Sequence, residues 1–280
     1  MSDWRSEYVV VGGIRLHYTR TGGSKPPLVL AHGVTDDGLC WTPVAQALAA
    51  EYDVVILDAR GHGLSDAPEH GYGPAQQAGD LAGVIAALGL ERPAVLGHSM
   101  GAATTLVAAG LYLDALGAIL LEDPPGWWAP QTNRSTSNEY RRAEMRERFA
   151  SVKTKSRDEL IAEQRAQSPG WSEAELGPWA DSKLMFSLNV LELLESASET
   201  SVDWQDALGR ITRPTLLMTA DVETGAVLPQ EGAAALQALV PQLRIEHFPG
   251  AGHNIRRDQF DRYIEVVRSF LSEHHGGRPA

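Results

Sequence analysis

Short apolar runs alternate along the chain with longer segments whose apolar residues recur at helical spacing. Four almost uniformly apolar runs are typical of strands buried on both faces: Leu28–Ala31, Val54–Leu57, Ala94–Leu96 and Leu116–Leu121. Segments rich in Ala and Leu predict the helices between them: Thr42–Ala50, Gln76–Leu88 and Met100–Tyr112. This alternation predicts a parallel sheet with helices on both faces.

The start of the chain follows a different pattern. Val9–Val11 and Ile14–Tyr18 flank the pair Gly12-Gly13, which is typical of a tight β-hairpin. We expect this hairpin to form an antiparallel edge of the sheet.

The middle of the chain interrupts the alternation. No β-like run occurs from residue 126 to residue 209, where charged helical segments and five of the seven tryptophans lie. Alternation resumes at Pro214 with two strands and two helices: Thr215–Thr219, Gln230–Leu239, Leu243–His247 and Gln259–Leu271. We therefore expect a core of residues 1–125 and 210–280, with a helical cap of residues 126–209 inserted into it.

Composition narrows the class of protein. The 280 residues are 43% hydrophobic and carry a formal net charge of −12, which suits a soluble globular protein and disfavours nucleic-acid binding. The single cysteine, Cys40, excludes an intramolecular disulfide and a multi-cysteine zinc site. The sequence holds no dinucleotide fingerprint or P-loop, so we expect neither a cofactor nor a metal. With no secretory signal or membrane-length apolar run, a cytoplasmic location without a membrane partner is expected, and a homodimer stays open.

One pentapeptide carries the strongest chemical signal. Gly97-His98-Ser99-Met100-Gly101 follows a predicted strand and opens a predicted helix, the context of a Gly-x-Ser-x-Gly nucleophile elbow. Its glycines let the backbone turn sharply and present the Ser99 hydroxyl. The N–H of Met100, at the start of the helix, can stabilise an oxyanion. Ser99 is therefore the predicted nucleophile.

Two further loops follow predicted strands. His32-Gly33-Val34 comes directly after the first buried strand, where the N–H of Val34 can complete an oxyanion hole. Gly250-Ala251-Gly252-His253 follows the last strand, and its small residues let the His253 imidazole reach Ser99 as the general base. The other histidines are poorer candidates for this base, because they lie on strands, in early loops or in the tail, or point away from the elbow. The loop Asp58–Asp66 is interpreted as structural.

Taken in order, these motifs resemble the α/β-hydrolase superfamily over about residues 8–271. The resemblance rests on the hairpin, the His-Gly loop, the Asp-x-Arg-Gly-His-Gly-x-Ser loop, the elbow, the helical insertion and the final Gly-x-Gly-His. It implies an eight-stranded, mostly parallel sheet, a cap between strands six and seven, and a Ser-His-acid triad.

The acid of that triad is the least certain residue. The resemblance places it after strand seven in a Gly-x-x-Asp pattern, but Thr219-Ala220-Asp221-Val222-Glu223 departs from that spacing. A minority of relatives, such as fungal-toxin lactonases and some ring-opened amide hydrolases, take the acid from the end of strand six. Asp123 lies at the matching place, 24 positions after Ser99. We favour Asp123 and keep Asp221 and Glu223 as alternatives.

These residues predict a serine hydrolase that cleaves a carboxylic ester or lactone, or an amide, through an acyl-enzyme. Two alternatives stay open on the same fold: a hydrolase of carbon–carbon bonds and a largely non-catalytic small-molecule receptor. The tryptophan-rich insertion favours a small apolar or aromatic substrate, with Trp127 and Trp128 expected to contact it.

Overall fold

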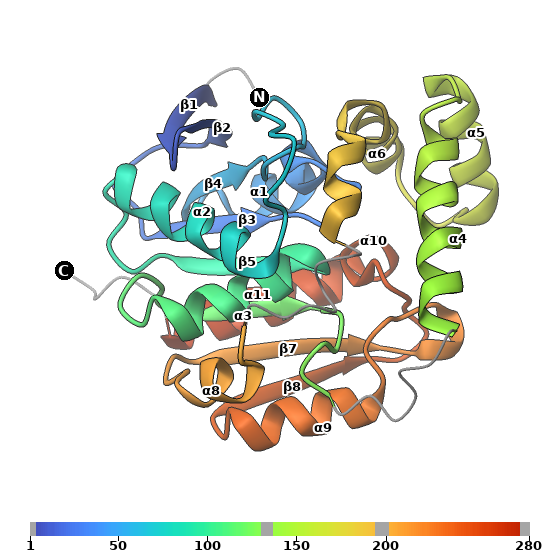
Figure 1. Ribbon diagram of the computed structural model, residues 1–280. Coiled ribbons are helices and arrows are strands. Elements are labelled where there is room, and N and C mark those ends of the chain that lie inside the picture. Colours follow the sequence, from blue (N-terminus) through green and yellow to red (C-terminus); the bar gives the residue numbers. More distant parts are fainter. Residues whose placement is uncertain (1–3, 130–136, 194–201, 275–280) are drawn as a thin grey trace.

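An eight-stranded sheet forms the centre of the protein in the computed structural model, which describes residues 4–129, 137–193 and 202–274, without the side chains of residues 137–142 (Figure 1). Its strands are β1 (Arg5–Val11), β2 (Ile14–Arg20), β3 (Pro27–Ala31), β4 (Asp53–Leu57), β5 (Ala94–His98), β6 (Ile119–Glu122), β7 (Thr215–Ala220) and β8 (Leu243–Phe248). They lie in the order β1-β2-β4-β3-β5-β6-β7-β8. β2 runs antiparallel to β1 and β4, and the pairs from β4 to β8 are parallel. The predicted mostly parallel sheet is confirmed.

Helices cover both faces of this sheet. One face carries α2 (Pro74–Ala87), α3 (Met100–Leu111), α8 (Trp204–Gly209) and α9 (Gln230–Leu239), and the other carries α1 (Thr42–Leu48) and α11 (Phe260–His274). In β5, Val95 packs against the first layer and Ala94 and Leu96 against the second, because side chains alternate along a strand. Both faces of the central strands are buried, which explains their uniformly apolar sequence.

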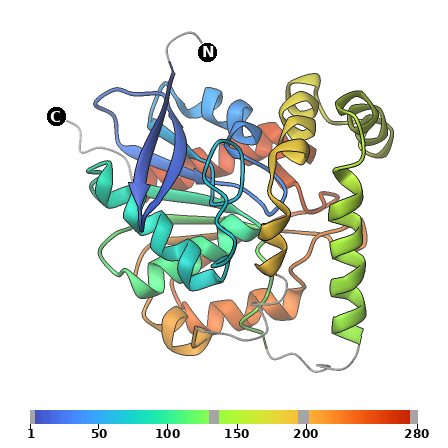
Figure 2. The same ribbon diagram turned by 45° about the horizontal axis from the view of Figure 1, so that its top comes forward.

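Further helices lie between β6 and β7. They are α4 (Ser137–Val152), α5 (Arg157–Gln167), α6 (Glu173–Met185) and the 3₁₀ turn η2 (Leu188–Leu191). Both ribbon views place α4, α5 and α6 on one side of the molecule, the side to which the arrow of β7 points in Figure 1 (Figures 1 and 2). Within the described residues, no helix has both the length and the apolar character needed to cross a membrane.

The two ends of the predicted insertion pack with the core. Trp128 is buried in the core, and its indole N–H donates to the Gly232 carbonyl at 2.9 Å. At the other end, α8 lies on α3, so close that a side-chain carbon on Gly110 would meet the Ala207 carbonyl oxygen at 2.2 Å. The helices α4, α5 and α6 and the turn η2 therefore span less than the predicted range 126–209. Residues 130–136 and 194–201 of this range lie outside the described residues.

The strand limits differ most from the prediction at the starts of two strands. β1 begins at Arg5, earlier than the predicted Val9, because pairing with β2 extends a segment whose side chains are mostly exposed. β6 begins at Ile119, three residues after the predicted start at Leu116. Apolar runs locate buried strands well, but they do not reveal where backbone pairing begins.

Candidate active site

Four loops carry the predicted site residues, and all four leave the same edge of the sheet. Val34 follows β3, Ser99 follows β5, Asp123 follows β6 and His253 follows β8. Parallel strands end at one edge, so residues far apart in the sequence meet there. Backbone bonds link the loops directly: the Ser99 N–H donates to the carbonyl of Glu122 at 2.9 Å.

Ser99 adopts a strained backbone conformation, with φ 51° and ψ −113°. Such a conformation costs a non-glycine residue on the order of 1–3 kcal/mol, so the surrounding contacts must hold it. Gly97 and Gly101 allow the turn, because a side-chain carbon on Gly97 would meet the Gly101 carbonyl oxygen at 2.4 Å, and one on Gly101 would meet that of Ala31 at 2.2 Å. The sequence therefore folds here as the predicted elbow, with Ser99 directly before α3.

His253 and Asp123 are joined by a short hydrogen bond. The distance from His253 Nδ1 to Asp123 Oδ2 is 2.6 Å. The Asp123 side chain is fully buried, and its carboxylate also accepts the backbone N–H groups of Val227 at 2.8 Å and Leu228 at 3.0 Å. Three donors thus fix the carboxylate, and the bond to Nδ1 leaves His253 Nε2 as the ring nitrogen able to accept a proton.

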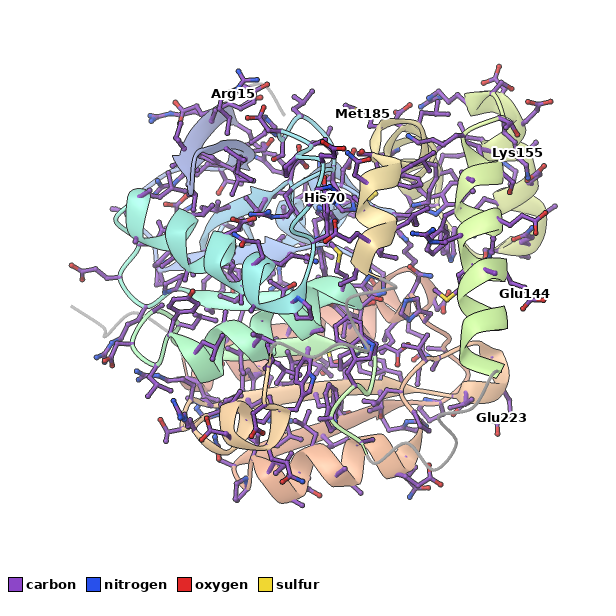
Figure 3. The ribbon with its side chains drawn as sticks, in the orientation of Figure 1. Arg15, His70, Glu144, Lys155, Met185 and Glu223 are labelled. Carbon is purple, nitrogen blue, oxygen red and sulfur yellow. The ribbon has the colours of Figure 1, made fainter. Side chains whose placement is uncertain are left out.

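The two alternative acids, Asp221 and Glu223, do not contact the His253 ring. Asp221 accepts the Gly250 N–H at 2.7 Å and lies 3.0 Å from His247 Nε2. Glu223 is exposed, and Figure 3 shows it at the outer surface of the molecule. Of the three carboxylates considered, Asp123 contacts the His253 ring.

Val34 and Met100 offer two N–H groups near Ser99. Within the described residues neither amide has a hydrogen-bond acceptor, and that of Met100 is among the unpaired donors that open α3. Both side chains belong to an apolar cluster in which Tyr72, Met100, Val190 and Leu193 are buried and Val34, Ala59 and Trp127 pack against them. This cluster joins the predicted oxyanion loops to residues of the insertion.

The two adjacent tryptophans share a neighbour in Trp204, whose ring centroid lies 5.9 Å from that of Trp127. Trp127 is partly buried and packs against the cluster around Met100. Trp128 packs in the core beside Trp204, with ring centroids 6.4 Å apart. Trp128 is thus the more deeply buried of the two, and the expectation that Trp127 and Trp128 contact the substrate stays a prediction.

His98 holds the loop that carries His253. Its Nε2 donates to the backbone carbonyl of His253 at 2.9 Å, and the two rings lie 4.7 Å apart. Burial, together with the nearby Arg256 and His253, holds the pKa of His98 well below its usual value, so its ring is neutral. His98 therefore positions the His253 loop through its single N–H.

A cluster of buried charges ties these loops together. Asp36, two residues after Val34, contacts Lys183 at 2.6 Å, Arg256 at 3.1 Å and Arg257 at 2.9 Å. Although burial alone would raise it, these three cations hold the pKa of Asp36 well below its usual value. The carboxylate is thus ionised and paired.

The same cluster of buried charges also includes residues of β6 and of helix α6. The short helix α10 (Ile255–Asp258) carries both arginines: Arg256 also bonds Glu122 at 3.0 Å, and Arg257 bonds Glu175 of α6 at 3.1 Å. The sequence reasoning missed this cluster. The pairs Asp36-Asp37 and Arg256-Arg257 beside buried motifs were its only local signal, and they do not specify partners.

The family is shown by comparison with known proteins. A family model for the alpha/beta hydrolase fold matches residues 26–256. The chain belongs to this family. The match runs from just before β3 to just after His253, so it contains all four loops of the α/β-hydrolase site.

Two curated relatives match this α/β hydrolase over nearly the whole length of both chains. N-formylmaleamate deformylase of Pseudomonas putida is 31% identical, over 94% of this chain and 95% of its own. 2-(Acetamidomethylene)succinate hydrolase of Mesorhizobium japonicum is 26% identical, over 95% of each chain. The protein is a hydrolase.

Solved structures agree with this assignment. N-formylmaleamic acid deformylase from Pseudomonas putida has a TM-score of 0.77 at 25% identity, with 94% of this chain and 100% of that chain covered. The enol-lactonase from Burkholderia xenovorans has a TM-score of 0.74 at 21% identity, with 95% and 100% covered, which shows the shared fold alone.

Proposed function

We propose that this hydrolase cleaves a carboxylic acyl bond by transferring the acyl group first to Ser99 and then to water. The observation that carries the proposal is the 2.6 Å bond from His253 to the buried Asp123, next to a serine in a strained elbow. A buried carboxylate on Nδ1 is the arrangement that lets a histidine act as a base through Nε2.

The proposed reaction uses each group for one task. Ser99 Oγ attacks the acyl carbon while His253 Nε2 takes its proton and then gives it to the departing amine or alcohol. Asp123 holds the ring in the required tautomer and stabilises its positive charge. The N–H groups of Val34 and Met100 donate hydrogen bonds to the negative oxygen. Water repeats these steps with His253 as base and releases the acid.

Amides and esters are the proposed substrate class. The two full-length curated relatives are named for N-formylmaleamate and 2-(acetamidomethylene)succinate, which favours an N-acyl compound. The apolar cluster around Met100, with Trp127 on its border, favours an apolar or aromatic group near the scissile bond. A lactone fits the same chemistry, because its ring-opened acyl-enzyme differs only in keeping the leaving alcohol attached.

Ser99→Ala tests this proposal. Loss of the nucleophile should lower kcat for p-nitrophenyl acetate by at least about 10⁴-fold, and the additional change His253→Ala should cost little more, because the residues act as a unit. Steady-state kinetics should be paired with thermal unfolding, which Ser99→Ala should leave nearly unchanged.

A pre-steady-state burst distinguishes acyl transfer from binding alone. With excess p-nitrophenyl acetate we expect about one equivalent of p-nitrophenolate in the burst phase for the parent and none on the same time scale for Ser99→Ala. If the variant keeps more than a few per cent of the parent's kcat, the assignment of Ser99 fails. A panel of N-formyl amides, aryl esters and lactones, ranked by kcat/KM, then assigns the substrate class.

A further inference from the structure

A second serine, histidine and aspartate are linked by hydrogen bonds at the hairpin edge of the sheet. Ser6 Oγ lies 2.7 Å from His17 Nε2, and His17 Nδ1 lies 2.8 Å from Asp58 Oδ2. The three residues come from β1, β2 and the loop after β4. None of them belongs to the loops around Ser99.

The acid of this set is held in the same way as Asp123. Asp58 is buried and accepts two backbone N–H groups, from Gly38 at 2.7 Å and from Leu64 at 3.0 Å, besides the His17 ring. Although burial raises it, the bonds from His17 and the backbone hold the pKa of Asp58 below its usual value. Its carboxylate can only accept, so His17 Nδ1 donates, and in the neutral ring Nε2 accepts the Ser6 hydroxyl proton.

Ser6 is accessible, whereas its base is sheltered. β1 is an edge strand of the sheet, and Ser6 on it is exposed, whereas His17 is buried. Tyr8 and Val10 share the face of β1 that carries Ser6, because side chains alternate, and both are largely exposed. Figure 3 shows Arg15, whose guanidinium lies over the Tyr8 ring, at this end of the molecule. An apolar and aromatic surface thus flanks the hydroxyl.

We propose that Ser6, His17 and Asp58 form a second nucleophilic site, at which Ser6 accepts an acyl or phosphonyl group from an activated aryl ester. Ser6 Oγ forms a bond to the acyl carbon or to phosphorus while His17 Nε2 takes its proton. The bond to the aryl oxygen breaks, and the departing phenolate takes the proton from His17. The exposed Tyr8 and Val10 favour an aryl leaving group on the donor.

This site is slower than a complete hydrolase site. Ser6 lies within a regular strand, so no helix begins there to stabilise an oxyanion as α3 does after Ser99. The loss of one oxyanion donor costs about 10²–10³-fold in rate. The activated aryl oxygen departs readily, whereas deacylation must expel the Ser6 oxygen, so the acylated Ser6 accumulates as a stable product.

Labelling of the Ser99→Ala protein tests the site directly. We expect p-nitrophenyl acetate, or a phosphonate with the same leaving group, to add one group per chain, located at Ser6 by peptide mapping. His17→Gln should slow this reaction at least tenfold, and Ser6→Ala should abolish it. Ser272 is the internal reference, because it is exposed and, among the described residues, its hydroxyl bonds only a backbone carbonyl. Modification of Ser6 no faster than that of Ser272 overturns the proposal.

A cysteine at the same position gives a test that leaves His17 in place. Ser6→Cys should react with iodoacetamide at pH 7 at least about tenfold faster than Ser272→Cys, because a neighbouring imidazole favours the thiolate. The native Cys40 does not interfere, since burial raises its pKa to about 12. Equal rates for the two variants would show that His17 does not activate position 6, and the proposal would fail.

Discussion

Hydrogen-bond partners decide what each histidine near Ser99 can do. His98 is adjacent to Ser99 in the sequence, but its one N–H binds the His253 carbonyl and its depressed pKa keeps the ring neutral. His253 lies far away in the sequence, but its Nδ1 faces Asp123 and its Nε2 stays free for a proton. The chemistry of a ring therefore follows from the group at its other nitrogen.

At this scale, Asp123→Asn is the decisive substitution. An amide in place of the carboxylate favours the wrong His253 tautomer and no longer stabilises the imidazolium, so kcat should fall by about 10³–10⁴-fold. Steady-state kinetics measure the loss, and circular dichroism checks the fold.

Asp221→Asn and Glu223→Gln are the matched controls. Neither carboxylate contacts His253, so each variant should keep kcat within about tenfold of the parent. If kcat fell by about 10³-fold in either control while Asp123→Asn kept full activity, the catalytic acid would lie in the loop after β7, and the assignment of Asp123 would be wrong.

At the scale of elements, the ends of the parallel strands and the helix α6 position the loops around Ser99. The elbow between β5 and α3 follows from local sequence, because its glycines permit a turn that other residues would block. The place of α6 does not, because both of its ends are held by buried ion pairs to distant loops, Lys183 to Asp36 and Glu175 to Arg257. Since Lys183 also donates to the carbonyl of Thr35, α6 supports the loop that carries Val34.

Lys183→Met tests the support given by α6. Breaking a buried ion pair costs about 3 kcal/mol, which for a chain of this size lowers Tm by about 6–12 °C. Lys155→Met is the control, because the Lys155–Glu163 pair lies at the surface, where such pairs contribute less than about 1 kcal/mol. Thermal unfolding measures both variants. Equal, small losses would show that the buried pair does not hold α6.

At the scale of the whole molecule, acidic residues exceed basic ones by 12, and some of the excess is buried. Asp37 is almost fully buried, and within the described residues one of its carboxylate oxygens has no hydrogen-bond partner. Burial and the neighbouring Asp58 and Asp36 raise its pKa to about 7. The folded chain therefore binds a proton here that the unfolded chain releases. The contribution of Asp37 to the free energy of unfolding therefore falls as the pH rises from about 3.8 towards 7, and it stays constant above pH 7.

Asp37→Asn should remove this pH dependence. The Tm of the variant minus the Tm of the parent should rise by several degrees between pH 5 and pH 8, because only the parent must ionise a buried carboxyl over this range. Asp114→Asn, at an exposed carboxylate, should show no such trend. Thermal unfolding across this pH range measures both, and parallel curves for the parent and Asp37→Asn would contradict the raised pKa.

Much of the fold could be predicted because its signals are local. Uniformly apolar runs located β3, β4 and β5, and the glycines around Ser99 and before His253 marked two turns whose conformation depends on neighbouring residues. Pairing was harder to predict: β1 extends to Arg5 through partners on β2, although its own side chains are exposed. Likewise, no sequence pattern showed that Trp128 is the more deeply buried of the two adjacent tryptophans.

The sequence by itself determined the order of strands and helices, the elbow at Ser99 and the late loop of His253, because these depend on spacing and on backbone freedom within a few residues. The tertiary structure decided which carboxylate meets His253, which cations surround Asp36, and that Ser6, His17 and Asp58 form a hydrogen-bonded chain. Each of these contacts joins residues from separate strands or loops. Their distances are fixed by sheet order and register, which no local pattern in the chain encodes.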